Sequence, residues 1–509
     1  MYKENQMFRD AKINKSGSVF FLLLVPDKTN QPNKKIMKGT LQKAWIAAVF
    51  VLLTGGPLAA QFKISAEFRP RGEYRDGYSK LLAGNQEPVF DILGRNRLIF
   101  DYKYEQFTAK FSFQHAYVYG ENTLGSDTIT RNTLNIYEAW FQYNFIRNIG
   151  IKLGRMELIY DDQRLLGNGN WSPRAVTHDA GQVKWDYADR SYRGDLGFAI
   201  NNTAPMQTYL SPYPLKNYKY LAYLYEQKKL FKDQLVLALL GITDIFQKPA
   251  VTTKTTTYDS IPVFDNTGSV IGYTQIPVVT TTTKANPEML YARFTVGGNV
   301  GFSWKNLKVF GAAYYQGGHY NDGHKISAGF YGGYVSYKVL KPLTLLVGYE
   351  RLTGNDFSDT TGMKTRLTSF STLYGTSHSK YGYMDMFSSH VTSGNSAGLR
   401  DFYAQATVRF TEKASLEATW RWFGLAQGYL NKKDGNLPYT KVDKNLGHEI
   451  DLMVIYTPVK NLEMNAAYCF FLPTDAMNQL NGLKAGTSDF AQYAYIQLTY
   501  RPTFFNTEK

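Results

Sequence analysis

The stretch that decides the fold is Phe62–Arg75, FKISAEFRPRGEYR, in which apolar and charged residues alternate. Apolar residues occupy the even positions from Phe62 to Phe68, whereas charged or polar residues occupy the odd positions from Lys63 to Arg75. Successive side chains of a β-strand point to opposite faces of a sheet, so this stretch predicts a strand with one apolar and one charged face. The same alternation recurs at 95–105, 401–410, 414–422 and 449–456.

Short turns and long polar segments separate these stretches in alternation. Turn-forming pairs such as Glu105–Gln106 and Lys305–Asn306 mark the short connections, and the long polar segments are 76–90, 120–132, 161–180, 202–217, 246–287, 355–398, 425–445 and 473–489. About 18 strands follow, with short turns at one end and long loops at the other, which is typical of bacterial outer-membrane barrels. We therefore predict an all-β fold, a transmembrane antiparallel up-and-down β-barrel with short periplasmic turns and long extracellular loops. Around Gly154 the alternation slips by one residue, which predicts a β-bulge.

Composition supports a membrane barrel against the alternatives. The chain of 509 residues is 44% hydrophobic and 15% aromatic, yet its mean hydropathy is −0.34. That value excludes a bundle of membrane-spanning helices, each of which needs about 20 mostly apolar residues. A soluble barrel or sandwich also alternates, but here nearly every strand has a charged face. A single Cys excludes a disulfide framework and a Cys-based metal site.

The N-terminal region has the layout of a secretory signal. Lys38 and Lys43 precede the apolar run Ala44–Leu53, and the small, helix-breaking residues TGGPLAA follow at 54–60. We expect residues 1–36 to be an upstream extension before the true start at Met37. Residues 37–60 are then the signal peptide and residues 61–509 the barrel, with a periplasmic N-terminus in a Gram-negative bacterium.

Several motifs resemble the alginate-export family of outer-membrane porins. They are GRMELIYDDQRLLG at 154–167, NWSPRAVTHDA at 170–180, GYERLTGND at 348–356, LYGTSHSKYGYMDMF at 373–387 and LGHEIDL at 446–452. The resemblance runs from about Phe62 to Tyr500. It implies an 18-stranded monomeric barrel with an Arg-rich lumen that passes anionic polysaccharide. The resemblance does not identify the substrate of this particular chain. The Thr-rich segment Gln247–Pro287 has no place in the family pattern, and we interpret it as a solvated loop.

Charged residues on the expected inward faces are the candidate contacts for a solute. Rings of Arg or Lys in a pore favour anions, and Arg binds carboxylates in a bidentate manner. The residues expected to line the pore are Arg69, Arg71, Arg95, Arg97, Arg155, Glu157, Asp161, Asp162, Arg164, Arg193, Arg293, Arg409 and Arg421. Two alternatives stay open: these charges pair across strands inside a water-filled barrel, or the polar residues at 155–164 pin a loop that folds inward.

These observations predict a monomeric channel for passive passage of anionic or polar carbohydrate-like solutes, not an enzyme. No metal, cofactor or nucleic acid is expected. The expected partners are outer-membrane lipid and lipopolysaccharide, the barrel-assembly machinery, and an anionic polysaccharide or small polar solute. The alternative is a barrel-based surface enzyme or receptor that acts through the long loops 246–287 and 355–398.

Overall fold

The computed structural model describes residues 60–507, except for 121–132, 188–190, 202–216, 248–250, 265–269, 285–289, 321, 359–365 and 432–439. The expected extension at 1–36 and nearly all of the signal peptide at 37–60 lie outside the described residues, so these boundaries stay predictions. Among the residues that are described, no helix is long and apolar enough to cross a membrane.

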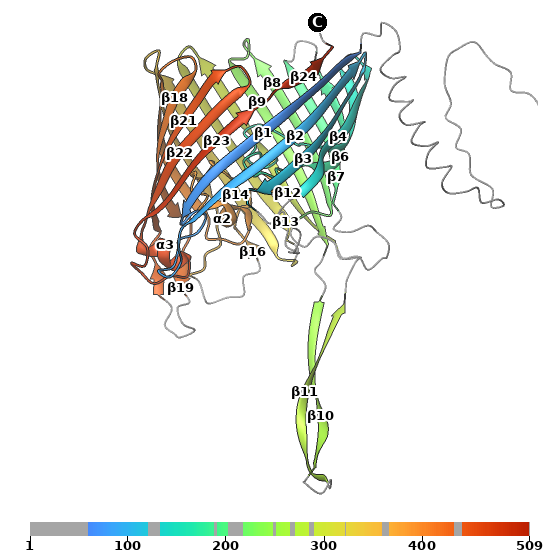
Figure 1. The fold of residues 1–509 in the computed structure, drawn as a ribbon, viewed down its shortest axis with the longest axis vertical. Helices are drawn as coiled ribbons and strands as arrows, with labels where there is room; N and C mark the ends of the chain where they lie inside the picture. The colour runs from blue at the N-terminus through green and yellow to red at the C-terminus, as the bar shows by residue number, and fades with distance from the viewer. Residues whose placement is uncertain are drawn as a thin grey trace, which may run out of the picture. The chain divides into compact units, whose positions relative to one another are not determined.

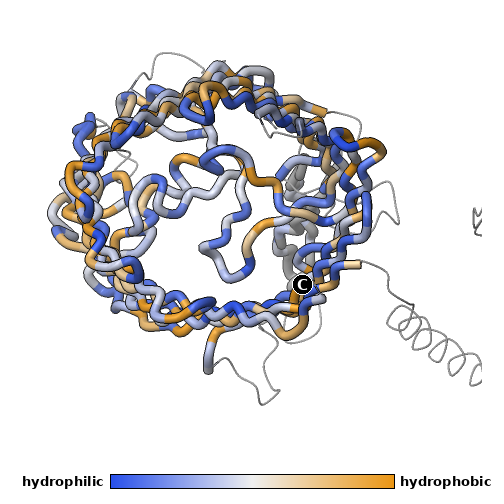
Figure 2. The backbone as a smooth tube through the Cα atoms, turned by 90° about the horizontal axis from the view of Figure 1, so that it is seen from above, coloured by the Kyte–Doolittle hydropathy of each residue, from blue (hydrophilic) through white to orange (hydrophobic). Residues whose placement is uncertain are grey.

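The chain forms a closed antiparallel barrel of 18 strands, as predicted (Figures 1 and 2). The barrel closes where β1 pairs with both β2 and β23, and closure leaves no strand edge to be satisfied in lipid. The short strand β24 (Thr503–Asn506) follows β23 and also pairs with β1. The strands of the barrel are β1 (Gln61–Asp76), β2 (Val89–Tyr104), β3 (Phe107–Val118), β4 (Thr133–Ile146), β5 (Ile149–Met156), β6 (His178–Asp186), β7 (Tyr192–Ile200), β8 (Tyr220–Leu230), β9 (Leu235–Gln247), β12 (Leu290–Trp304), β13 (Leu307–His319), β14 (Lys325–Lys338), β15 (Leu343–Leu352), β17 (Leu399–Arg409), β18 (Ala414–Leu425), β21 (Asn445–Val459), β22 (Leu462–Pro473) and β23 (Ala491–Tyr500).

The two ends of the barrel differ, and we call them the short-turn end and the long-loop end. At the short-turn end only a few residues join neighbouring strands, for example 105–106, 305–306 and 460–461. The long-loop end carries the connections with their own secondary structure: β16 (Arg366–Leu367), α2 (Ser388–Thr392), β19 (Tyr429–Asn431), β20 (Thr440–Val442) and α3 (Asp475–Leu480).

Each strand has the two faces that its sequence predicts. On β1 the side chain of Phe68 is 42% exposed on the outer surface, whereas its neighbours Glu67 and Arg69 are buried on the inner side. On β23 Ile496 is 64% exposed, and Gln497 and Tyr495 are buried. Because side chains alternate across a strand, the apolar residues form an outer surface suited to lipid and the charged residues line the interior.

Two expectations about local structure are wrong. The first is the slip at Gly154, since β4 and β5 pair without a shift from Ala139↔Arg155 to Asn144↔Gly150. Gly154 is needed there for another reason. It has a φ of +125°, and a Cβ atom at this position would lie 2.2 Å from the carbonyl oxygen of Ala139.

The second concerns the Thr-rich segment, which we interpreted as a solvated loop and which has regular secondary structure. It forms the hairpin of β10 (Val251–Phe264) and β11 (Val270–Lys284), seen below the barrel in Figure 1. The runs of Thr are opposite each other in the strand register, as in the pair Thr255↔Thr280. Thr is β-branched and forms favourable cross-strand pairs, so this composition stabilises strands.

Two connections at the long-loop end fold into the barrel, where Figure 2 shows chain crossing the interior. We call 157–177 lumen loop 1 and 353–398 lumen loop 2. They pair with each other through the main chain: the amide of Tyr374 donates to the carbonyl of Leu165 (3.1 Å), and the amide of Thr376 donates to that of Gln163 (2.9 Å). Leu165, Leu166 and Phe370 are buried where the loops pack, so the barrel holds a small apolar core.

Candidate functional site: the lumen

The arginine cluster expected on the first two strands binds the backbone of lumen loop 1. Arg69 donates to the carbonyl of Asn170 (2.5 Å), Arg71 to that of Trp171 (2.9 Å), and Arg95 to that of Asn170 (3.1 Å). These three side chains are at most 5% exposed. These arginines therefore hold the backbone of lumen loop 1, and two of them also pair with acids of β1: Arg71 with Glu73 (2.5 Å), and Arg95 with Glu67.

A stack of rings joins both lumen loops to β1. The guanidinium of Arg71 lies 3.6 Å from the ring centre of Trp171, and that ring stacks on His378 of lumen loop 2 at 3.8 Å. The Nδ1 atom of His378 is 2.8 Å from Asp385, whose carboxylate also accepts a hydrogen bond from Tyr78 in the connection between β1 and β2. Cation–π contact and ring stacking thus link three separate segments of the chain.

Arg164 joins lumen loop 1 to the wall and to lumen loop 2. Its guanidinium binds both oxygens of Glu350 on β15, at 2.6 and 2.7 Å, and the hydroxyl of Tyr381 at 2.7 Å. It also binds Asp162 at 2.9 Å. Burial alone would raise the pKa of the Asp162 carboxyl, but the charges of Arg164 and Lys380 outweigh it and hold that pKa below its ordinary value.

Lumen loop 2 is held by two further arginines from the expected set. Arg421 on β18 donates to the carbonyl of Lys380 (3.1 Å) and pairs with Asp401 (2.5 Å). Arg293 on β12 binds Asp244 (3.0 Å), and the hydroxyl of Tyr374 donates to the same carboxylate (2.8 Å). Both arginines are buried, so they also act mainly on protein groups.

Three arginines of the expected set face the interior and keep part of their surface open. Arg97 donates to Gln114 (2.7 Å) and lies over the ring of Tyr137 (3.7 Å). Arg193 pairs with Asp195 and is 40% exposed in its side chain. Arg409 ends β17 at the short-turn end and is exposed.

The remaining expected residues fall in different places. Glu157 accepts a hydrogen bond from Tyr137 (2.5 Å), and Asp161 accepts one from Tyr225 (2.8 Å), so both acids fix lumen loop 1 to the wall. Arg155 shares the outer face of β5 with Leu153, because no bulge reverses the alternation. There it pairs with Asp179 at 2.7 Å, outside the lumen.

Several of the residues that meet in the lumen lie within the family-like motifs. Arg164 belongs to the first motif, Glu350 to GYERLTGND, Tyr381 to LYGTSHSKYGYMDMF, and Glu449 of LGHEIDL accepts a hydrogen bond from the amide of Met384 (2.9 Å). Sequence reasoning did not select Glu350 or Tyr381 as site residues. The shared signal was their presence in these motifs, which the structure brings together around the lumen loops.

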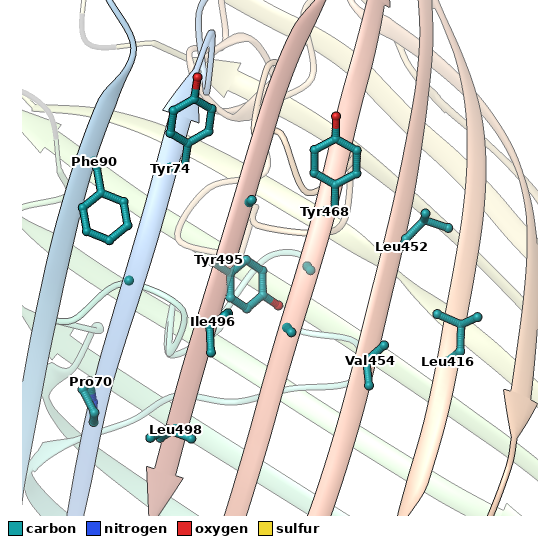
Figure 3. A pocket seen from close by; sticks show the side chains of 14 residues that line it. Pro70, Tyr74, Phe90, Leu416, Leu452, Val454, Tyr468, Tyr495, Ile496 and Leu498 are labelled. Atoms are coloured by element: carbon teal, nitrogen blue, oxygen red, sulfur yellow. The ribbon is translucent and has the colours of Figure 1, made fainter.

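A separate hollow of about 780 Å³ lies on the outer face of the barrel (Figure 3). Phe90, Tyr74, Tyr468 and Leu416 are among the side chains around it. Its lining is apolar and faces outward, so it does not belong to the conduction path. Within the described residues, no group of three His, Cys, Asp or Glu side chains could hold a metal ion.

A closed barrel with an apolar outer face and a charged interior narrowed by loops is an outer-membrane channel. The chain belongs to the alginate export family, whose model matches residues 60–488 and confirms the resemblance noted in the sequence.

Solved porin structures share the fold. OccK9 (OpdG) of Pseudomonas aeruginosa is 12% identical with a TM-score of 0.54, and the match covers 88% of this chain and 99% of that one. A BenF-like porin from Pseudomonas fluorescens Pf-5 is 11% identical with a TM-score of 0.52, covering 87% and 99%. The outer membrane protein OprD from Pseudomonas aeruginosa is 10% identical with a TM-score of 0.51, covering 87% and 94%. A search of curated protein sequences found no match.

Proposed function

We propose that this barrel is a passive channel for anionic or polar carbohydrate-like solutes, with selectivity from arginine and lysine on its inner face. The observation that carries the proposal is that the inner face holds two sets of cations with different surroundings. Buried arginines anchor two loops that narrow the passage, and other cations on the same inner face stay partly open to water. Cationic groups along a narrow passage raise the local concentration of anions and lower their entry barrier.

Weak and repeated contacts suit translocation better than one tight site, because a solute must also leave. Arg97, Arg193 and Arg409 come from three different strands, β2, β7 and β17, and each is partly open. Arg97 and Arg193 also have a protein partner. An acidic sugar therefore exchanges between them without a long residence. Family membership in alginate export supports a carbohydrate-like substrate.

The assembly and surroundings follow from the same proposal. We expect a monomer inserted by the barrel-assembly machinery, with lipid and lipopolysaccharide against the outer face and the N-terminus in the periplasm. The short turns would then face the periplasm and the lumen loops would enter from the extracellular side, as in bacterial barrels of this kind.

Conductance in planar lipid bilayers tests the function. A channel predicts a steady ion current, and a KCl gradient should give a reversal potential that indicates preference for chloride over potassium. A barrel that inserts but does not conduct would favour the alternative of a surface enzyme or receptor. A conducting barrel that prefers cations would refute anion passage.

A further inference from the structure

An inward-facing cavity of about 650 Å³ lies at the short-turn end of the barrel. No described residue of either lumen loop is part of its lining. Strands β4 to β8 and two of their turns supply its lining. The lining contains five cations and one acid: Arg147, Lys152, Lys184, Arg193, Lys229 and Asp186. Of these residues, Lys152, Lys184, Arg193 and Asp186 lie on strand faces that the sequence alternation turns toward the lumen.

The cavity opens to the interior of the barrel, not to lipid. Leu153, Val183 and Leu196 are 40–52% exposed on the outer surface. Lys152 directly precedes Leu153 on β5, and Lys184 directly follows Val183 on β6. Alternation along a strand therefore turns both lysines to the opposite, inner face. The cavity therefore lies beside the path that a solute takes through the lumen.

Positive charge exceeds negative charge in this cavity. The buried carboxylate of Asp195 is shared by two cations, Lys184 at 2.6 Å and Arg193 at 2.7 Å. Among the described residues, the ion pair of Lys229 is a loose one with Asp233, at 3.7 Å, and that acid is 69% exposed on the turn. The ammonium of Lys152 lies over the ring of Trp140 at 3.8 Å, while the nearby Glu138 is paired with Lys110 at 2.6 Å.

From this geometry we propose that the cavity is a binding site for a carboxylated oligosaccharide at the short-turn end of the channel. The inference rests on the proposed function, and it locates the main anion contact in a cavity lined by three lysines and two arginines instead of at the arginines bound to the lumen loops. A cavity of 650 Å³ falls within the usual range of about 300–1,000 Å³ for small-molecule sites. Lysines act as hydrated point charges, which attract carboxylates without holding them in a rigid bidentate geometry.

Neutral polar groups in the same lining favour a sugar over a simple anion. The side chains of Gln142, Gln227 and Tyr187 also border the cavity and can exchange hydrogen bonds with hydroxyl groups. The combination of several cations with amide and phenol groups matches a ligand that carries both carboxylates and hydroxyls.

Single-channel recording with an oligogalacturonate in both chambers tests this site, with an uncharged oligosaccharide of equal length for comparison. The test variant is Arg147→Gln/Lys152→Gln/Lys229→Gln, which leaves the buried Asp195 with both of its partners. The matched control is Lys228→Gln/Lys305→Gln/Lys341→Gln, which removes three exposed cations at the same end, on the outer face and the turns, that do not line the cavity. Heat-dependent migration in gels checks that both variants fold.

We expect the oligogalacturonate to block the wild-type current transiently and the uncharged sugar to block it far less. In the test variant the dissociation constant for block should rise about tenfold and the chloride-to-potassium permeability ratio should fall about threefold, while the control changes neither appreciably. If the wild type prefers anions but the test variant keeps both properties, this inference is wrong and the proposed function survives. Equal block by the uncharged sugar also overturns it. If the variant does not fold, Lys152→Gln alone repeats the test with a smaller expected change in the same direction.

Discussion

Replacing Arg164 by Met should release lumen loop 1 from the wall and from lumen loop 2. The guanidinium is 4% exposed and makes two hydrogen bonds to Glu350 and one to Tyr381. Its loss leaves the Glu350 carboxylate buried without its hydrogen-bonded cation, since the hydrogen bonds described for this group all come from Arg164. Removal of one partner from a buried ion pair costs about 3–5 kcal/mol.

That energy sets the size of the effect on the loop. At about 1.4 kcal/mol for each factor of ten, the ratio of docked to undocked lumen loop 1 should fall about a hundredfold or more. The carbonyl contacts of Arg69, Arg71 and Arg95 remain, so the loop should fluctuate between positions without leaving the lumen entirely. Such motion on the microsecond to millisecond scale is visible as noise on the open-channel current.

Single-channel recordings at fixed voltage measure this noise. Arg164→Met should increase the variance of the open level and add partial closures, whereas Arg409→Met at the exposed end of β17 should leave the record quiet. The double variant Arg164→Met/Glu350→Leu should recover much of the quiet record, because an apolar pair can replace a buried ion pair at little cost. A current in Arg164→Met as steady as in the wild type would refute the assignment of this ion pair as an anchor of the loop.

Three further predictions follow from the same structure. Asp162 has a lowered pKa in the folded protein, so its stabilising contribution is present above its ordinary pKa of 3.8 and is lost as the pH falls through the lower folded pKa. Channel noise should therefore rise on acidification from pH 5 to 3, and Asp162→Asn should be noisy already at pH 5, with a weaker pH dependence. Deletion of the hairpin at 251–284, with a short Gly–Ser linker in its place, should leave the barrel folded and its conductance within about 20% of the wild type. The reason is that β10 and β11 pair only with each other in the part of the chain that is described. A large loss of conductance would contradict this prediction. Gly154→Ala should lower the free energy of unfolding in urea by about 1–3 kcal/mol, because the new methyl group would meet the carbonyl of Ala139 at an unfavourable φ. Gly120→Ala is a control for the positive φ alone, since no described atom lies within 4 Å of its added Cβ.

The charged face of each strand was predictable, but the use of its charges was not. Alternation correctly turned Arg95 inward, and nothing near it in the sequence indicated that it would bind carbonyls of residues 75 positions away. Arg164 and Glu350 are 186 residues apart, and their contact exists only when the barrel is closed and both loops are inside it. The family-like motifs contained both residues without showing that they touch.

The errors have local physical reasons. The apparent slip at Gly154 came from reading a change in residue type as a change in register, whereas hydrogen-bond pairing with β4 keeps the register continuous and turns Arg155 outward. The Thr-rich segment was interpreted by its polarity, although the β-branched side chain of Thr, repeated on both arms, favours paired strands. In this segment the backbone preference of Thr, and not its polarity, indicates the hairpin.

The sequence by itself determined the two-faced strands, their number and the contrast between short turns and long loops. These features depend on a period of two and on turn residues, which are local properties of the chain. Only the tertiary structure decided which arginines hold the lumen loops and which cations remain open to a solute. That division depends on contacts between segments far apart in the chain, because the carbonyl of Asn170 reaches Arg95 and the carboxylate of Glu350 reaches Arg164 only after the barrel closes.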